Sequence, residues 1–183
     1  MQSTNETTLV QLAQKGNSNA AGQLYEMHQP GIFQYLFYRV GDVHTAEELT
    51  GEVFLKMVRA LPGYRSTNGT FRSWLYTIAR NMAIDHHRRA SNRPQAAFDD
   101  ELGLTGEDAR NAVDIKLTRE ALQEALKRLP DIQRDVIILR FVENMTLEEV
   151  AHMLHKTYDS IKSLQRRALV VLRQALLEQE EIL

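Results

Sequence analysis

The run TLEEVAHMLHKTYDSIKS at residues 146–163 contains two short helical patterns separated by a tight turn. Thr146 and Glu149 have the spacing of a capping box, so the first helix is expected to begin at Thr146 and to end near His155. A second cap is available at Thr157 or Asp159. The helix that follows is predicted to bury one face, formed by Ile161, Leu164, Ala168, Leu169 and Leu172. Two helices joined in this way are typical of a helix-turn-helix.

The second helix of this pair has a basic and hydroxyl-bearing face away from the predicted core. That face consists of Ser160, Lys162, Ser163, Arg166 and Arg167. Arg and Lys can bind guanine or neutralise phosphate, and Ser can donate to a phosphate or to a base edge. The pattern therefore predicts that this helix enters a DNA major groove. An ordinary pair of helices with a solvated basic face is the alternative interpretation.

The composition limits the class of protein. A chain of 183 residues that is 43% hydrophobic can form one medium domain or two small ones. It contains no apolar run of about 18 residues and begins with a polar stretch, so we expect a cytoplasmic protein without membrane insertion. The absence of cysteine excludes disulfides, thiolate metal sites and cysteine nucleophiles. No motif indicates a cofactor.

Charge is unevenly distributed along the chain, although the net charge is only −2. One basic segment contains a single carboxylate, Asp85, and five arginines: Arg72, Arg80, Arg88, Arg89 and Arg93. A second basic segment contains only one carboxylate, Asp159, and five basic residues: Lys156, Lys162, Arg166, Arg167 and Arg173. These two basic patches are compatible with a nucleic-acid partner despite the acidic average.

An acidic stretch at residues 95–114 separates the two patches. It has one basic residue, Arg110, against Asp99, Asp100, Glu101, Glu107, Asp108 and Asp114. Its weak apolar periodicity and its two glycines predict a flexible linker. The chain is therefore divided into a domain at 1–94 and a domain at 115–183. Both show helical periodicity without strand alternation, which predicts an all-α fold of two small helical domains.

Four helices are expected in the N-terminal domain. The first is short and lies around Leu9, and the second spans about 20–39, where Pro30-Gly31 is expected to kink or to split the helix. The third runs from about 43 to 61 between Asp42 and Pro62-Gly63. The fourth starts near Thr70 and ends in the first basic segment.

Three phrases of this sequence resemble the extracytoplasmic-function group of the bacterial sigma-70 family. DVHTAEELTGEVFL at 42–55 is similar to the helix with which sigma factors bind core RNA polymerase. FRSWLYTIARNMAID at 71–85 is similar to their promoter-melting helix. Leu129-Pro130, followed by Arg134, Val136, Leu139, Arg140 and the helix-turn-helix, resembles their −35-reading domain. The resemblance covers roughly residues 8–176, with the three phrases in the family's order.

The resemblance implies a non-enzymatic initiation subunit that docks on core RNA polymerase, recognises the −35 and −10 promoter elements and promotes melting. The surface for the clamp coiled coil of the largest polymerase subunit would be Glu47, Glu48, Leu49, Glu52, Val53 and Phe54. The −10 element would be bound by Tyr64, Arg65, Ser66, Thr67, Asn68, Arg80, Asn81, Arg88 and Arg89. The −35 element would be bound by the basic and hydroxyl face described above. An anti-sigma protein is a further partner that the family implies.

Two of these assignments have alternatives in the residues themselves. Leu49, Val53 and Phe54 have helical core spacing, and Trp74 is expected in the core rather than stacked on a base. Three positions also depart from the family pattern. His155 stands where glycine is usual at the turn, so either His155 would need a left-handed backbone conformation or the turn would have to change shape. Leu164 replaces a frequent basic residue, and Gly51 replaces a commoner glutamine.

Two other functions compete with this interpretation. Glu148, Glu149, His152 and His155 could form a metal site, as could the run at 85–87, but a helical di-iron site needs a second Glu-x-x-His that the sequence lacks. A stand-alone helix-turn-helix regulator would bind duplex DNA alone, commonly as a symmetric dimer. The N-terminal phrases argue against it, because they show neither a ligand pocket nor a dimer seam.

Overall fold

A computed structural model of the chain describes residues 5–66, 69–91 and 119–180. Within these ranges all regular structure is helical, which confirms the predicted all-α class. No helix in the described part of the chain is long and apolar enough to cross a membrane. The linker predicted at 95–114, with the domain boundaries beside it, lies outside the described residues.

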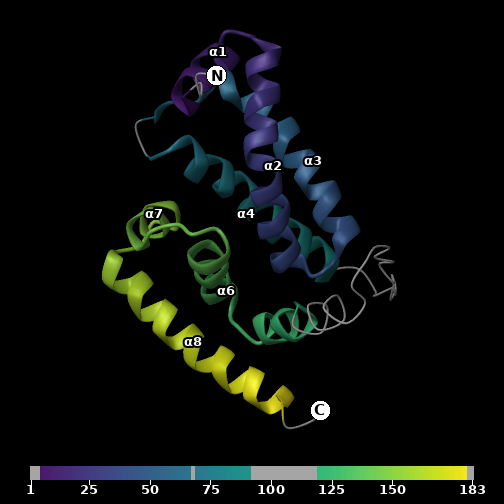
Figure 1. Cartoon of the computed structure of the whole chain (residues 1–183), viewed down its shortest axis with the longest axis vertical. Coiled ribbons are helices and arrows are strands. Elements are labelled where there is room, and N and C mark those ends of the chain that lie inside the picture. The colour runs from purple at the N-terminus through teal and green to yellow at the C-terminus, as the bar shows by residue number, and fades with distance from the viewer. Residues whose placement is uncertain (1–4, 67–68, 92–118, 181–183) are drawn as a thin grey trace, which may run out of the picture.

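The N-terminal bundle consists of four helices, shown in the upper half of Figure 1: α1 (Glu6–Gln14), α2 (Ser18–Val40), α3 (Val43–Ala60) and α4 (Phe71–Ser91). Helix α3 begins as predicted, because the Asp42 carboxylate accepts the Thr45 N–H at 2.7 Å. A short 3-10 turn at Leu61–Gly63 ends it. Helix α4 follows Thr70, whose hydroxyl accepts the Ser73 N–H at 3.1 Å.

Helix α2 passes through Pro30 without a break, so the expectation that the proline splits the helix is wrong. An interior proline costs a helix about 3 kcal/mol. Leu24, Ile32 and Leu36, on both sides of the proline, are fully buried. Each buried side chain of this size contributes about 1.5–3 kcal/mol, so tertiary packing outweighs the local preference.

The C-terminal bundle contains a helix at 119–127, α6 (Asp131–Ile137), a π-helical stretch at Ile138–Val142, α7 (Leu147–Met153) and α8 (Tyr158–Glu180). Both hydrogen bonds of the predicted capping box are present. The Glu149 N–H donates to the Thr146 hydroxyl at 3.1 Å, and the Thr146 N–H donates to the Glu149 carboxylate at 2.7 Å. Thr157 caps α8 by accepting the Ser160 N–H. His155 adopts the expected left-handed conformation at the turn, with φ 52°.

The inner face of α8 is as predicted except at one position. Ile161, Leu164, Ala168 and Leu172 are buried, but Leu169 is 41% exposed. The buried positions follow spacings of three and four residues, and Leu169 lies one step around the helix from that stripe. The expectation for Leu169 was therefore wrong.

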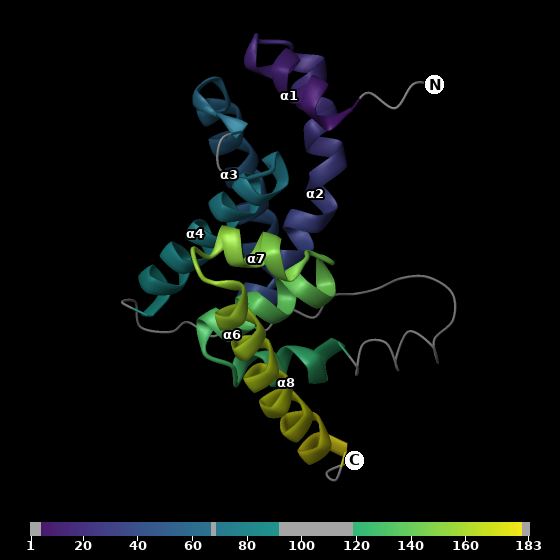
Figure 2. The same cartoon turned by 90° about the vertical axis from the view of Figure 1, so that its left-hand side faces the viewer.

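The two bundles pack against each other. Helix α7 contacts α4, and the π-helical stretch contacts α2. Figure 2 shows α7 lying across the N-terminal bundle between α4 and α2. The buried apolar side chains of both bundles form one continuous core. The two predicted domains are thus joined by a buried interface as well as by the chain between them.

Candidate nucleic-acid interface

The outer face of α8 presents the residues predicted to bind DNA. Lys162, Ser163, Arg166 and Arg167 are exposed, and Ser160 is partly exposed. Within the described part of the chain, Lys162 and Arg166 form no ion pair, so their charges are free for an external anion. Leu164, the departure from the family pattern, is buried and makes no basic contribution to this face.

Helix α4 positions the second set of predicted DNA contacts. Arg88 and Arg89 are exposed in its last turn, and Asn81 is exposed near its middle. Arg88 is 3.3 Å from Asp85, one turn away on the surface of the helix. Basic residues at a helix C-terminus also interact favourably with the helix dipole, so Arg88 and Arg89 have a structural role besides any DNA contact.

The loop before α4 forms an aromatic corner. The Tyr64 ring is half-buried, with its centroid 4.8 Å from that of Trp74 and 5.6 Å from that of Phe71. Trp74 packs partly buried against the core, in agreement with the core assignment. Arg65 and Ser66 are exposed, whereas Thr67 and Asn68 lie outside the described residues.

Arg80 is the predicted DNA contact whose position differs most from expectation. Its side chain is only 25% exposed, and its Nε donates to Asp135 of α6 at 2.7 Å. The guanidinium is therefore already occupied by the C-terminal bundle in this conformation. Sequence reasoning did not identify Asp135, because its spacing in α6 carries no signal of a distant partner.

Asp135 is fully buried and accepts two further hydrogen bonds from α2. The Tyr35 hydroxyl donates at 2.9 Å and the Arg39 Nε at 2.8 Å. Arg39 also reaches Asp131 at 3.2 Å. Burial, followed by the charge of Asp135, raises the pKa of Tyr35 well above its ordinary value, so this hydroxyl stays a donor.

A second buried carboxylate, Glu143, lies beside α2 and α4. The Tyr76 hydroxyl donates to its Oε2, and Arg72 donates to its backbone carbonyl and lies 3.7 Å from Oε2. Burial raises the pKa of Glu143 although Tyr76 and Arg72 oppose this shift. Its Oε1 is buried and has no hydrogen-bond partner among the residues that the structure describes. Both buried carboxylates of the C-terminal bundle thus depend on donors from the N-terminal bundle.

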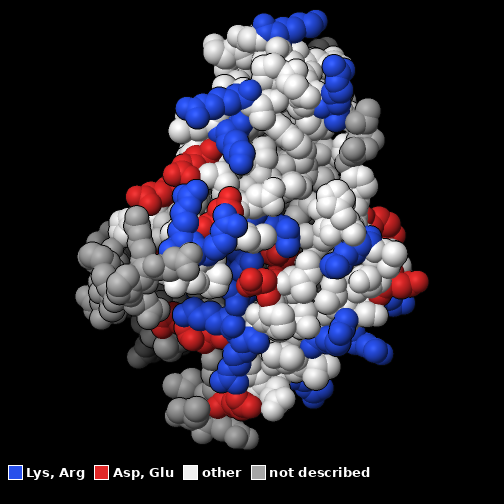
Figure 3. All heavy atoms as spheres, turned by 180° about the vertical axis from the view of Figure 1, so that it is seen from behind, with Lys and Arg blue, Asp and Glu red and all other residues white. Residues whose placement is uncertain are grey.

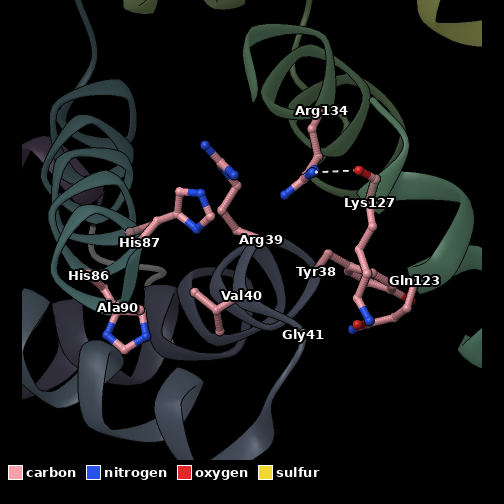
Figure 4. A pocket seen from close by; sticks show the side chains of 11 residues that line it. Tyr38, Arg39, Val40, Gly41, His86, His87, Ala90, Gln123, Lys127 and Arg134 are labelled. Atoms are coloured by element: carbon pink, nitrogen blue, oxygen red, sulfur yellow. Dashed lines mark hydrogen bonds between the residues drawn. The ribbon is translucent and has the colours of Figure 1, made fainter. Parts of the chain in front are cut away.

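A cavity of about 520 Å³ lies where α2 and α4 face the helix at 119–127 and α6. Figure 4 shows Arg39 and Arg134 pointing into the same space from the two bundles. Both are already satisfied: Arg39 by Asp131 and Asp135, and Arg134 by the carbonyls of the helix end at Leu126, Lys127 and Leu129. The cavity therefore offers no unpaired guanidinium to a small anion.

The predicted polymerase-binding helix α3 separates into two faces. Leu49, Val53 and Phe54 are buried in the core, as the alternative interpretation held. Glu47, Glu48 and Glu52 are exposed. Sequence reasoning gave no role to Val58, which lies near Leu55 on the outside, and the two are 53% and 60% exposed. The signal was available, because both are out of phase with the buried stripe.

Charged side chains gather over the middle of the face opposite to that of Figure 1, where Lys and Arg form a broad band interspersed with Asp and Glu (Figure 3). In the residues that the structure describes, no three His, Asp or Glu side chains come together as metal ligands.

Two family models match the chain: Sigma-70 region 2 over residues 24–93 and Sigma-70, region 4 over residues 125–174. The ECF RNA polymerase sigma factor BldN of Streptomyces coelicolor is 34% identical over 170 residues, or 92% of this chain, which spans 64% of that relative's length. SigX of Bacillus subtilis is 31% identical, with 82% of this chain and 80% of SigX covered.

Solved structures share the fold. CnrH in complex with the cytosolic domain of CnrY superposes with a TM-score of 0.72 at 24% identity, covering 93% of this chain and 96% of CnrH. The sigma factor RpoE in complex with the anti-sigma factor NepR, from Bartonella quintana, superposes with a TM-score of 0.66 at 19% identity. The match covers 85% of this chain and 95% of RpoE. Both agree with an arrangement of two helical bundles.

Proposed function

Because the chain belongs to the extracytoplasmic-function group of the sigma-70 family of RNA polymerase sigma factors, we propose a separate task for each of its three surfaces. It acts in transcription initiation, with core RNA polymerase and promoter DNA as its partners. The stand-alone regulator is not favoured, because the match extends over both bundles. Catalysis then belongs to the polymerase, and we expect the protein to act in the cytoplasm, where both partners are.

The −35 element is assigned to the N-terminal half of α8. The observation that supports this most strongly is the pair of exposed cations Lys162 and Arg166, which have no carboxylate partner among the described residues and lie above a buried inner face. Helix α7 packs against α8, as the first helix of a helix-turn-helix packs against the second. Arg167 and Ser163 extend the same face, and Ser160 lies at its edge in the first turn of α8.

The −10 element is assigned to α4 and the loop before it. Arg80, Arg88 and Arg89 would neutralise phosphates, and Asn81 with loop residues 64–68 would hold an unstacked base of the non-template strand. Extruding a base costs a few kcal/mol, which stacking and hydrogen bonds in the protein offset. Melting in this way requires no nucleotide hydrolysis.

Core polymerase is assigned to the outer face of α3. Glu48 and Glu52 lie one turn apart, where they can meet basic partner residues. We add Leu55 and Val58, because an exposed apolar pair beside carboxylates has the composition of an interface core with a polar rim. Leu49, Val53 and Phe54 would then support this face from beneath. An anti-sigma protein is a further proposed partner, of the kind that RpoE of Bartonella quintana binds in its complex with NepR.

Run-off transcription with purified bacterial core RNA polymerase tests the proposal. Adding the chain to a pool of genomic promoter fragments should produce new discrete start sites. Lys162→Ala and Arg166→Ala should each weaken promoter use by about tenfold or more, because one good base or phosphate contact contributes about 1–3 kcal/mol. Lys127→Ala, an exposed cation of the same bundle that lies outside α8, is the matched control. Duplex binding without any stimulation of transcription would instead indicate a stand-alone regulator.

A further inference from the structure

We infer that the C-terminal bundle of the free chain covers part of its own −10 surface, with Asp135 occupying the Arg80 guanidinium and Glu143 holding the same closed arrangement through Arg72 and Tyr76. We name this set of contacts the interdomain clasp: Asp131, Asp135 and Glu143 on one side, and Tyr35, Arg39, Arg72, Tyr76 and Arg80 on the other. The inference rests on the proposed function in one respect, namely that Arg80 and α4 bind the −10 element.

Asp135 is the centre of the clasp. Its carboxylate is 0% exposed, and the three side chains that donate to it all come from the N-terminal bundle. A buried carboxylate is tolerated only where its hydrogen bonds are complete, since an unpaired buried charge is strongly destabilising. Asp135 therefore gains its partners only when the bundles are closed, and it returns to water when they separate.

Glu143 supports the same closed arrangement from a second position. The Tyr76 hydroxyl reaches it across the backbone of α2 at Gly31. A Cβ added at Gly31 would clash with that hydroxyl and lie 3.0 Å from the Glu143 Oε2. Glycine lowers helix stability in the middle of an element, so its presence within α2 needs a structural reason. The space that it leaves for the Tyr76–Glu143 hydrogen bond supplies this reason.

The loop that should hold an unstacked base also meets the C-terminal bundle. A Cβ added at Gly69 would lie 2.9 and 3.0 Å from two ring atoms of His152 in α7. Helix α7 also packs on α4. The loop and the helix assigned to the −10 element are therefore both in contact with α7.

DNA and the clasp compete for the same guanidinium. The Nε of Arg80 has one proton and donates it to Asp135, so that donor cannot serve a phosphate until the clasp opens. By contrast, Lys162 and Arg166 stay exposed in the closed chain. The clasp should consequently weaken −10 binding and leave −35 binding unchanged.

The first test removes the central charge. Asp135→Asn should increase the affinity of the free chain for a single-stranded −10 oligonucleotide by about tenfold, because apparent affinity scales with the fraction of open molecules. Fluorescence anisotropy gives this affinity, and small-angle X-ray scattering should show a larger radius of gyration. Affinity for −35 duplex should not change. Asp159→Asn, an exposed carboxylate in the same bundle, controls for net charge in the −10 measurement.

The second test opens the clasp without changing any charge. Gly31→Ala should displace the Tyr76 hydroxyl and raise −10 oligonucleotide affinity in the same direction. Gly22→Ala is its matched control, since it lies in the same helix and an added Cβ there meets no atom within 4 Å. A gain of binding cannot result from unfolding, so the pair remains informative if a variant loses some stability.

Unchanged −10 affinity and unchanged scattering in both Asp135→Asn and Gly31→Ala would overturn the clasp. So would equal gains in −10 and −35 binding, because a covered −10 surface predicts a selective effect. Failure of the proposed function is seen separately: the wild-type chain would then not direct transcription by core polymerase, whatever the scattering of the variants shows.

Discussion

At the scale of the residue, buried titratable groups give the clearest consequences. His28 is buried in α2. Its Nε2 lies 2.6 Å from the Glu6 Oε1, and its ring packs against that of Phe71. Burial lowers its pKa, although Glu6 opposes the shift. The unfolded chain therefore takes up this proton at a higher pH than the folded chain does, so stability is retained above the unfolded pKa and declines as the pH falls. We predict a lower free energy of unfolding at about pH 5 than at about pH 7.

Urea denaturation across this range measures the effect. His28→Gln should reduce the pH dependence, because it removes the group that protonates preferentially in the unfolded state. His44→Gln, at an exposed position in the same bundle, should retain the wild-type slope. If the free energy of unfolding changes with pH by the same slope in all three proteins, His28 does not contribute to the pH dependence of stability.

At the scale of the element, two glycines of the N-terminal bundle should respond to alanine with opposite signs. Gly51 lies in the middle of α3, and an added Cβ meets no atom within 4 Å. Gly51→Ala should raise the free energy of unfolding by about 0.5–1 kcal/mol. Gly41 ends α2 with φ 84°, and its added Cβ would lie 3.1 Å from Gln123. Gly41→Ala should therefore lower the free energy of unfolding by about 1 kcal/mol or more.

Chemical denaturation of both variants under the same conditions checks the pair. The affinity of Gly51→Ala for core polymerase is a second measurement on this variant, because Gly51 lies on the exposed side of the predicted docking helix. Stabilisation by both substitutions would contradict the left-handed conformation at Gly41.

At the scale of the whole molecule, the clasp couples the stability of the two bundles. Asp135 has its partners in the other bundle, and the apolar cores of the two bundles are continuous. We predict one thermal transition for the wild-type chain by differential scanning calorimetry, because neither bundle can open without exposing part of the other. Asp135→Asn should separate this into two transitions or broaden it.

The matched control is again Asp159→Asn, which should keep the single wild-type transition. Two resolved transitions in the wild-type chain would mean that the bundles unfold independently and that the interface contributes little to stability.

Local patterns predicted the four N-terminal helices, the helix-turn-helix and the exposed outer face of α8, whereas the helix at 119–127 and α6 were given no bounds. The capping box at Thr146 and Glu149 and the cap at Thr157 involve groups three residues apart, so they follow from sequence alone. The same patterns did not separate core from interface in α3, because buried Leu49, Val53 and Phe54 have residue types that suit both. At Pro30 the local preference was overruled by burial on both sides.

By itself, the sequence determined the all-helical class, the helix-turn-helix and the family, since these depend on spacings of a few residues and on three phrases in order. Only the tertiary structure decided that Arg80 pairs with Asp135. Asp135 lies 55 residues from Arg80, 96 from Arg39 and 100 from Tyr35. No local period encodes such a contact, because it exists only once two separately patterned bundles have packed against each other.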